Sequence, residues 1–179
     1  MPGEPVKILL TGPPGCGKTT AVMKIVSALD KKLRRAGFYT EEIREAGRRK
    51  GFRWHRLDGR TGTLAHVDIK GPHRVSKYGV DIESFDREAV SVLNSDASNV
   101  DLFVVDEIGK MECFSGKFVD AIRRLLDSDR SVLATVAQKG SGLIREVKSR
   151  SSIKLLHLST TNRDEVTQQA IDMLAALRA

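Results

Sequence analysis

The feature that most constrains this 179-residue chain is a glycine-rich segment near its N-terminus. It fits the pattern G-x-x-x-x-G-K-[ST], follows an apolar run from Val6 to Leu10, and opens a stretch of helical periodicity. A strand, a glycine-rich turn and a helix in this order point backbone N–H groups and the positive end of a helix dipole at phosphate oxygens. The segment therefore predicts a nucleotide-binding loop, formed by Gly12, Pro13, Pro14, Gly15, Cys16, Gly17, Lys18, Thr19 and Thr20.

Two side chains of this loop carry specific chemistry. Lys18 can reach the β- and γ-phosphates of a bound nucleotide, and the Thr19 hydroxyl can ligate Mg²⁺. The alternative is a glycine-rich turn between a strand and a helix with an incidental lysine. Because both flanking elements are recognisable, the phosphate-binding interpretation is favoured.

A second informative segment is the apolar run from Leu102 to Val105, which ends in Asp106 and Glu107. Continuous apolar runs are typical of buried parallel strands, and ligands bind beyond the carboxyl ends of such strands. Asp106 is thus expected to hold Mg²⁺ directly or through water, and Glu107 to take a proton from an attacking water. Glu112, in the loop that follows, is a second catalytic candidate, with a structural role equally open. An acidic turn that merely ends a core strand is the alternative for the pair.

Composition indicates an ordinary soluble chain. Its length favours a single domain over residues 1–179, and the two cysteines, Cys16 and Cys113, fit neither a zinc site nor a disulfide framework. No apolar stretch approaches the length that spans a membrane. We therefore expect a cytoplasmic protein, monomeric and without a membrane partner.

Basic residues outnumber acidic ones by 30 to 23, a net charge of +7, and they concentrate between Arg44 and Arg60. Phe52 and Trp54 lie among them, a pattern that would suit base stacking against a nucleic acid. A solvated basic hairpin is the commoner explanation, and we favour it. A basic field also helps to capture nucleoside triphosphates, which are polyanions.

Strand-like and helix-like segments alternate along most of the chain, which predicts a three-layer α/β sandwich of the P-loop NTPase type. The sheet is expected to be mostly parallel, with a small antiparallel excursion near residues 38–69, and with the strand at 131–136 between the loop strand and the strand that ends in Asp106. A loop is expected at 71–79. The expected strands are 6–10, 38–44, 51–57, 63–69, 100–105, 131–136 and 153–158. The expected helices run from the loop to about Arg35, where Gly37 would end the first one, then 84–93 with Ser84 as cap, 117–126, 142–148, and a last helix capped by Thr161 or Asn162.

Several motifs together resemble the small cancer-related nucleoside-triphosphatases of animals and their thermophilic relatives. They cover nearly the whole chain in the expected order: Thr11 through Thr20, Gly37 through Arg44, Gly47-Arg48-Arg49, Gly51-Phe52, Lys77 through Asp81, Asp106 through Glu112, and Asn162-Arg163-Asp164. The run Asp-Glu-Ile-Gly-Lys-Met-Glu is the specific one. The chain departs from the family at Ser76, where glycine is usual, and at Ala137-Gln138, where histidine or proline is frequent, so no γ-phosphate sensor is assigned.

The resemblance implies slow, Mg²⁺-dependent hydrolysis of ATP, GTP, CTP and UTP to the diphosphate, with broad base tolerance. Transition-state charge calls for a cation beyond Lys18, and Arg44, Lys110 and Arg163 are the candidates. Arg163 is also expected to contact the nucleotide, where its guanidinium could lie over any base. The alternative functions are a nucleotide or polynucleotide kinase, and a nucleotide-gated switch that binds nucleic acid.

Overall fold

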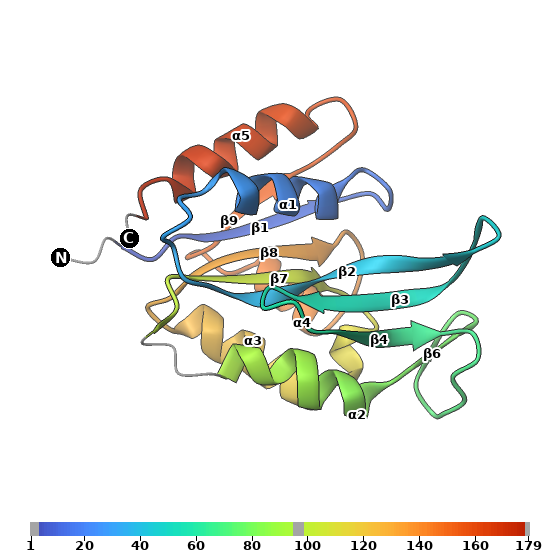
Figure 1. Cartoon of the computed structure of the whole chain (residues 1–179). Helices are drawn as coiled ribbons and strands as arrows, with labels where there is room; N and C mark the ends of the chain where they lie inside the picture. The colour runs from blue at the N-terminus through green and yellow to red at the C-terminus, as the bar shows by residue number, and fades with distance from the viewer. Residues whose placement is uncertain (1–3, 95–98, 178–179) are drawn as a thin grey trace.

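The computed structural model describes residues 4–94 and 99–177, and these form one mixed sheet of nine strands with helices on both faces (Figure 1). The strands are β1 (Lys7–Gly12), β2 (Arg35–Glu45), β3 (Arg48–Arg56), β4 (Thr61–His66), β5 (Arg74–Val75), β6 (Tyr78–Val80), β7 (Leu102–Ile108), β8 (Ser131–Ala137) and β9 (Lys154–His157). The helices are α1 (Lys18–Ala28), α2 (Ile82–Ser84), α3 (Gly116–Asp127), α4 (Leu143–Lys148) and α5 (Arg163–Leu174).

Strand order confirms the predicted α/β architecture. The sheet runs β5-β6-β4-β3-β2-β7-β8-β1-β9, in which β2, β7, β8, β1 and β9 are mutually parallel. The remaining pairings are antiparallel and form the expected excursion. As predicted, β8 lies between β1 and β7. The carboxyl ends of β1, β7 and β8 therefore meet at one edge of the sheet, where a ligand site is expected.

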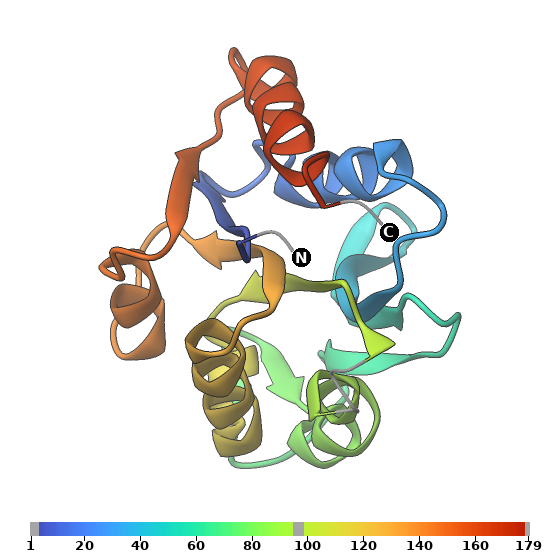
Figure 2. The same cartoon turned by 90° about the vertical axis from the view of Figure 1, so that its left-hand side faces the viewer.

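Helices cover both faces of the sheet (Figures 1 and 2), and an apolar cluster of side chains lies on each face. One joins α1 and α5 to β1, through buried residues such as Ile8, Val22 and Ala170. The other packs α3, α4 and the turns after α2 against the opposite face, with Phe38, Phe85 and Phe118 in mutual ring contact. Alternate residues of the central strands supply both clusters, because successive side chains of a strand point to opposite faces.

The first helix is shorter than its periodicity predicted, since α1 ends at Ala28 and β2 already begins at Arg35. Asp30 accepts a hydrogen bond from the Lys32 N–H (2.9 Å), which forms a turn, and the Arg35 guanidinium donates to the Val26 carbonyl oxygen (2.7 Å) at the helix end. Leu33 is still buried, which explains the misleading apolar spacing.

Gly37 does not end that helix but lies inside β2, beside β7. Its φ is +127°, and a Cβ built there would lie 1.8 Å from the Val104 carbonyl oxygen. The glycine is thus required by the close approach of two neighbouring strands rather than by a helix terminus.

Two other predictions were wrong in part. The segment 71–79, expected to be a loop, contains β5 and the start of β6. The helix expected from Ser84 begins one turn earlier, because Asp81 accepts the capping hydrogen bond from the Ser84 N–H (3.0 Å). It continues as a π turn at Phe85–Ala89 and a 3-10 turn at Val90–Asn94.

Candidate active site

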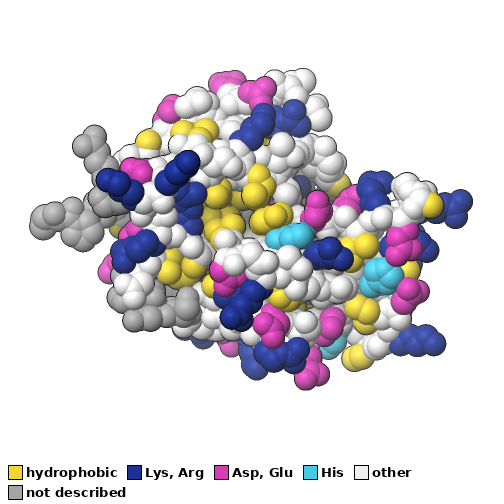
Figure 3. Space-filling view, in the orientation of Figure 1, with side chains coloured by type: hydrophobic (Ala, Val, Ile, Leu, Met, Phe, Trp, Pro, Cys, Tyr) yellow, Lys and Arg dark blue, Asp and Glu magenta, His cyan; other side chains and the backbone are white. Residues whose placement is uncertain are grey.

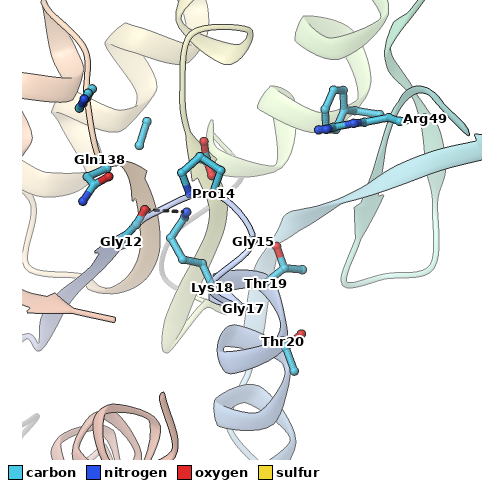
Figure 4. Close-up of a pocket in the computed structure, with 13 residues that line it drawn as sticks. Gly12, Pro14, Gly15, Gly17, Lys18, Thr19, Thr20, Arg49 and Gln138 are labelled. Carbon is cyan, nitrogen blue, oxygen red and sulfur yellow. Dashed lines mark hydrogen bonds between the residues drawn. The ribbon is translucent and has the colours of Figure 1, made fainter. Parts of the chain in front are cut away.

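The predicted phosphate loop borders a cavity of about 650 Å³ at the carboxyl edge of the sheet (Figure 4). Loop residues form one wall, and strands β3, β7 and β8 with the chain just after β8 provide the rest. The lining residues are Gly12, Pro14, Gly15, Gly17, Lys18, Thr19, Thr20, Arg49, Phe52, Glu107, Ala137, Gln138 and Lys139. The volume lies in the usual range of small-molecule sites.

Lys18 is the first residue of α1 and lies over the loop. Its Nζ donates to the carbonyl oxygen of Gly12 (3.1 Å), as Figure 4 shows, and lies 3.4 Å from that of Pro13. The helix has no side-chain cap and no acidic residue in its first turn, so its N-terminal N–H groups face the cavity without a competing carboxylate. This arrangement suits an anionic ligand. Cys16 is buried beneath the loop, and Pro13 belongs to its turn, since its carbonyl oxygen accepts from the Cys16 N–H (3.2 Å).

Asp106 is buried at the centre of this edge, with 1% of its surface exposed. It accepts hydrogen bonds from the hydroxyls of Thr19 in α1 (2.7 Å) and Thr135 in β8 (2.5 Å). Burial raises the pKa of this carboxyl, and the bonds from Thr135 and Thr19 oppose that rise. The sequence predicted that Asp106 and Thr19 would meet. The role of Thr135 was missed, although a hydroxyl within an apolar strand is its visible signal.

Glu107 and Glu112 lie close together beside Gly109. A Cβ built on Gly109 would lie 2.8 Å from Glu107 Oε1 and 2.9 Å from Glu112 Oε2. Burial raises the pKa of Glu107, Lys18 opposes that shift, and Asp106 adds to it. Burial together with the charge of Glu107 raises the pKa of Glu112 to about 8. The pair thus brings one carboxylate to the cavity wall and keeps a second carboxyl protonated behind it at neutral pH.

Arg163 begins α5 and packs directly on the phosphate loop. A Cβ built on Gly17, whose φ is +97°, would lie 2.8 Å from both Cδ and Nη1 of Arg163. Asn162 precedes the helix as expected, but its side chain accepts from the Ser159 N–H (2.7 Å) instead of capping the helix. The Arg163 Nε is buried without a hydrogen-bond partner. The guanidinium thus packs against the loop at Gly17, but it is not among the residues that line the cavity, so its predicted contact with the nucleotide stays a prediction.

The other two cations proposed for the transition state lie differently. Arg44 is tied to Glu42 (2.6 Å) and to the Gly47 carbonyl oxygen (3.1 Å) at the end of the β2–β3 hairpin, and it does not line the cavity. Lys110 is exposed and lines a smaller cavity next to Glu107. Arg49, which the sequence analysis named within the motif Gly47-Arg48-Arg49 without assigning it a role, does line the main cavity. Its place on β3 and the order of the strands bring it to the cavity.

The hairpin does not present the aromatic surface that base stacking would require. Trp54 is 2% exposed and packs against Gly62, so this half of the stacking hypothesis was wrong. Phe52 instead lines the cavity, with the Arg49 guanidinium 5.5 Å from its ring centre. On the face in Figure 3, acidic side chains are interspersed with basic ones around the hairpin end, and Glu42 pairs with both Arg44 and Arg49.

Comparison with known proteins agrees with this geometry. A family model described as NTPase matches residues 7–171. The chain belongs to this NTPase family. Among curated relatives, the nucleoside-triphosphatase THEP1 of Thermotoga petrophila is 39% identical over 169 residues, covering 94% of this chain and 93% of the relative. The human cancer-related nucleoside-triphosphatase is 37% identical over 185 residues, covering 96% and 97%.

Solved structures of NTPase relatives share the whole fold. The crystal structure of THEP1 from Aquifex aeolicus superposes with a TM-score of 0.85 at 34% identity, covering 97% of this chain and all of that one. The solution structure of the human cancer-related enzyme gives 0.81 at 35% identity. The predicted family and fold class are thus confirmed, and membership places this chain among the nucleoside-triphosphatases. Within the described residues, no helix is long and apolar enough to span a bilayer.

The raised pKa of Glu112 predicts how the folding stability of this NTPase depends on pH. An unfolded chain ionises Glu112 near pH 4.5, whereas the folded chain keeps it protonated to about pH 8. Folding stability is therefore lost as the pH rises between these values, on the order of 5 kcal/mol at most, at about 1.4 kcal/mol per pKa unit. We expect Glu112→Gln to raise the melting temperature more at pH 8 than at pH 5, measured calorimetrically without nucleotide. An equal change at both pH values would contradict the assignment.

Proposed function

We propose that this chain is a Mg²⁺-dependent nucleoside-triphosphatase that hydrolyses ATP, GTP, CTP and UTP to the diphosphate and phosphate with little base discrimination. The observation that carries the proposal is the 2.7 Å hydrogen bond between the hydroxyl of Thr19 and the carboxylate of Asp106. It joins the phosphate loop to the acidic end of β7, so that a phosphate group and a metal ion would be bound side by side.

The residues present fit a hard cation such as Mg²⁺. Asp106 is a buried carboxylate that forms no ion pair within the described part of the chain, and the Thr19 hydroxyl beside it is a second oxygen ligand. The described residues contain no cluster of three or more His, Cys, Asp or Glu able to hold a metal ion. Mg²⁺ in nucleotide sites does not need one, because phosphates and waters complete its shell. When bound, the ion would neutralise charge on the β- and γ-phosphates.

The protein's own groups then have distinct tasks. Lys18 and the N-terminal amides of α1 would hold the phosphates. The Lys18 ammonium would then donate its hydrogen bonds to the ligand instead of to the carbonyl oxygens of Gly12 and Pro13. Glu107 lines the cavity and would orient a water and take its proton. Glu112, protonated at neutral pH, would keep a second negative charge away from the incoming phosphate. All these groups address phosphate, metal or water.

Weak base discrimination follows from the same inventory. Arg163, which packs on the loop at Gly17, is the residue that we assign to contact the base. A guanidinium plane can stack on any base, whereas strong selection needs hydrogen bonds that read a base edge. The two cysteines are free thiols, which suits a reducing compartment such as the cytoplasm, and we propose a single-domain monomer there.

The test is phosphate release from the four triphosphates with and without Mg²⁺. We expect rates within about tenfold of one another, lost on chelation, and reduced about 10²- to 10³-fold in Lys18→Ala, because a charge contact to the transferring group disappears. Lys24→Ala, an exposed lysine of the same helix, is the matched control and should retain the parent rate. A preference above about 10²-fold for one base would contradict the broad specificity.

We also propose that Arg49 stabilises charge on the γ-phosphate during hydrolysis. Of the hairpin arginines, it is the one among the lining residues of the nucleotide cavity. Glu42 (3.1 Å) and the Phe52 ring hold its guanidinium without burying it. It approaches from the strand side, opposite the loop that carries Lys18 (Figure 4). A cation in this place would complement Lys18 across the transferring group.

Replacing Arg49 with Ala is therefore expected to lower kcat by about 10²-fold, while the Kd of a non-hydrolysable triphosphate changes less than about threefold. Arg48→Ala removes an exposed neighbour that does not line the cavity, and it should leave both quantities unchanged. Steady-state kinetics and calorimetric titration measure the two effects. Equal losses of kcat in Arg48→Ala and Arg49→Ala would contradict a specific role for Arg49, because the effect would then come from the overall positive charge of the hairpin.

A further inference from the structure

A second cavity, of about 270 Å³, adjoins the nucleotide cavity at Glu107. Four residues line both spaces: Phe52, Glu107, Ala137 and Lys139. This cavity therefore leaves room beside Glu107 for a molecule larger than the single water that hydrolysis requires. Its size is unexplained by hydrolysis.

The walls of this second cavity are suited to an organic molecule. Phe52, Leu64, Val75 and Met111 make most of its lining apolar. Leu64 is buried, and Val75 is half-buried on the short strand β5. Small-molecule sites typically combine such walls with a few polar groups that fix orientation.

The polar groups of the cavity converge on its junction with the nucleotide site. Glu107 lies on the shared wall, and no described side chain donates a hydrogen bond to it. Glu112 lies beside it, across Gly109. An acceptor-only carboxylate left without a donor is available to a hydroxyl group that enters from the second cavity.

We propose that the second cavity binds a small alcohol and that the chain transfers the γ-phosphoryl group to its hydroxyl as well as to water. The proposal rests on the proposed triphosphate site, which supplies the donor. The alcohol oxygen forms a bond to the γ-phosphorus, and the bond from that phosphorus to the β–γ bridging oxygen breaks. The hydroxyl proton passes to Glu107 and then to solvent. The products are a phosphate monoester and a nucleoside diphosphate.

The lining also defines the class of acceptor. The apolar wall fits a compact aromatic or aliphatic body that carries a hydroxymethyl group. Lys110 and Lys139 are exposed and line the same cavity, so they favour an anionic substituent on that body. The expected acceptor is thus a small primary alcohol with an apolar body and one negative charge.

The experiment follows the label from γ-³²P-GTP in the presence of Mg²⁺ and one of three probes: 4-(hydroxymethyl)benzoate, benzyl alcohol or glycerol. We expect labelled phosphate monoester from 4-(hydroxymethyl)benzoate. The fraction of transferred label found in this monoester should exceed, by at least about 10²-fold, the fraction that the probe contributes to all hydroxyl groups in solution, water included, because a bound nucleophile gains effective concentration. Benzyl alcohol should give less monoester, and glycerol only the amount that its hydroxyl concentration predicts. Label in inorganic phosphate alone would overturn the acceptor site but leave the hydrolase intact. Label that never leaves GTP would overturn both.

Two variants locate the effect. Val75→Trp fills the second cavity and should abolish monoester formation while phosphate release into water stays within about twofold. Val67→Trp makes the same change at a half-buried valine that lines neither cavity, and it should retain both products. Monoester formation that survives Val75→Trp would overturn the location.

A charge-reversal variant tests the proposed acceptor class even if the Val75→Trp protein does not fold. Lys110→Glu should shift the ratio of monoesters by about tenfold from 4-(hydroxymethyl)benzoate towards 4-(aminomethyl)benzyl alcohol, because the exposed charge beside the acceptor changes sign. The ratio is measured within one enzyme, so a change in overall rate does not affect it. An unchanged ratio would overturn the proposed acceptor class.

Discussion

The hydrogen bonds that Asp106 accepts hold the site of this NTPase together. The carboxylate is buried at the end of β7 and joins Thr19 of α1 to Thr135 of β8. A buried carboxylate is costly unless it is well bonded, and removing either donor would leave it under-satisfied. The phosphate loop, β7 and β8 are therefore fixed relative to one another by the group that is proposed to hold the metal ion.

The order of strands in the sheet makes this arrangement possible. Because β8 lies between β1 and β7, the loop after β1 and the acidic end of β7 lie two strands apart, with the Thr135 hydroxyl between them. The antiparallel excursion adds β3 to the far side of β2, and through it Arg49 and Phe52 reach the same cavity. The parallel half of the sheet thus supplies the phosphate and acid groups, and the excursion supplies the opposite wall.

The sequence alone predicted those site residues that belong to a contiguous sequence motif. Lys18 and Thr19 follow from the glycine-rich loop, and Asp106 follows from an apolar strand that ends in carboxylates. The roles of Arg49 and Thr135 did not follow, because they depend on which strands lie beside β7: β8 pairs with it directly, and β3 is joined to it through β2. The extent of the first helix was overestimated for a related reason: Leu33 is buried by the turn before β2, and burial alone does not distinguish a turn from a helix.

The most direct test of the role of Asp106 is the Mg²⁺ dependence of nucleotide binding in Asp106→Asn. Titration with a non-hydrolysable triphosphate, with and without Mg²⁺, separates binding from catalysis. The parent is expected to bind at least about tenfold more tightly with Mg²⁺, about 1.4 kcal/mol, and the variant equally with and without it, since the amide keeps its shape but loses the charge that a hard cation requires. A variant that retains the full tightening by Mg²⁺ would contradict the account.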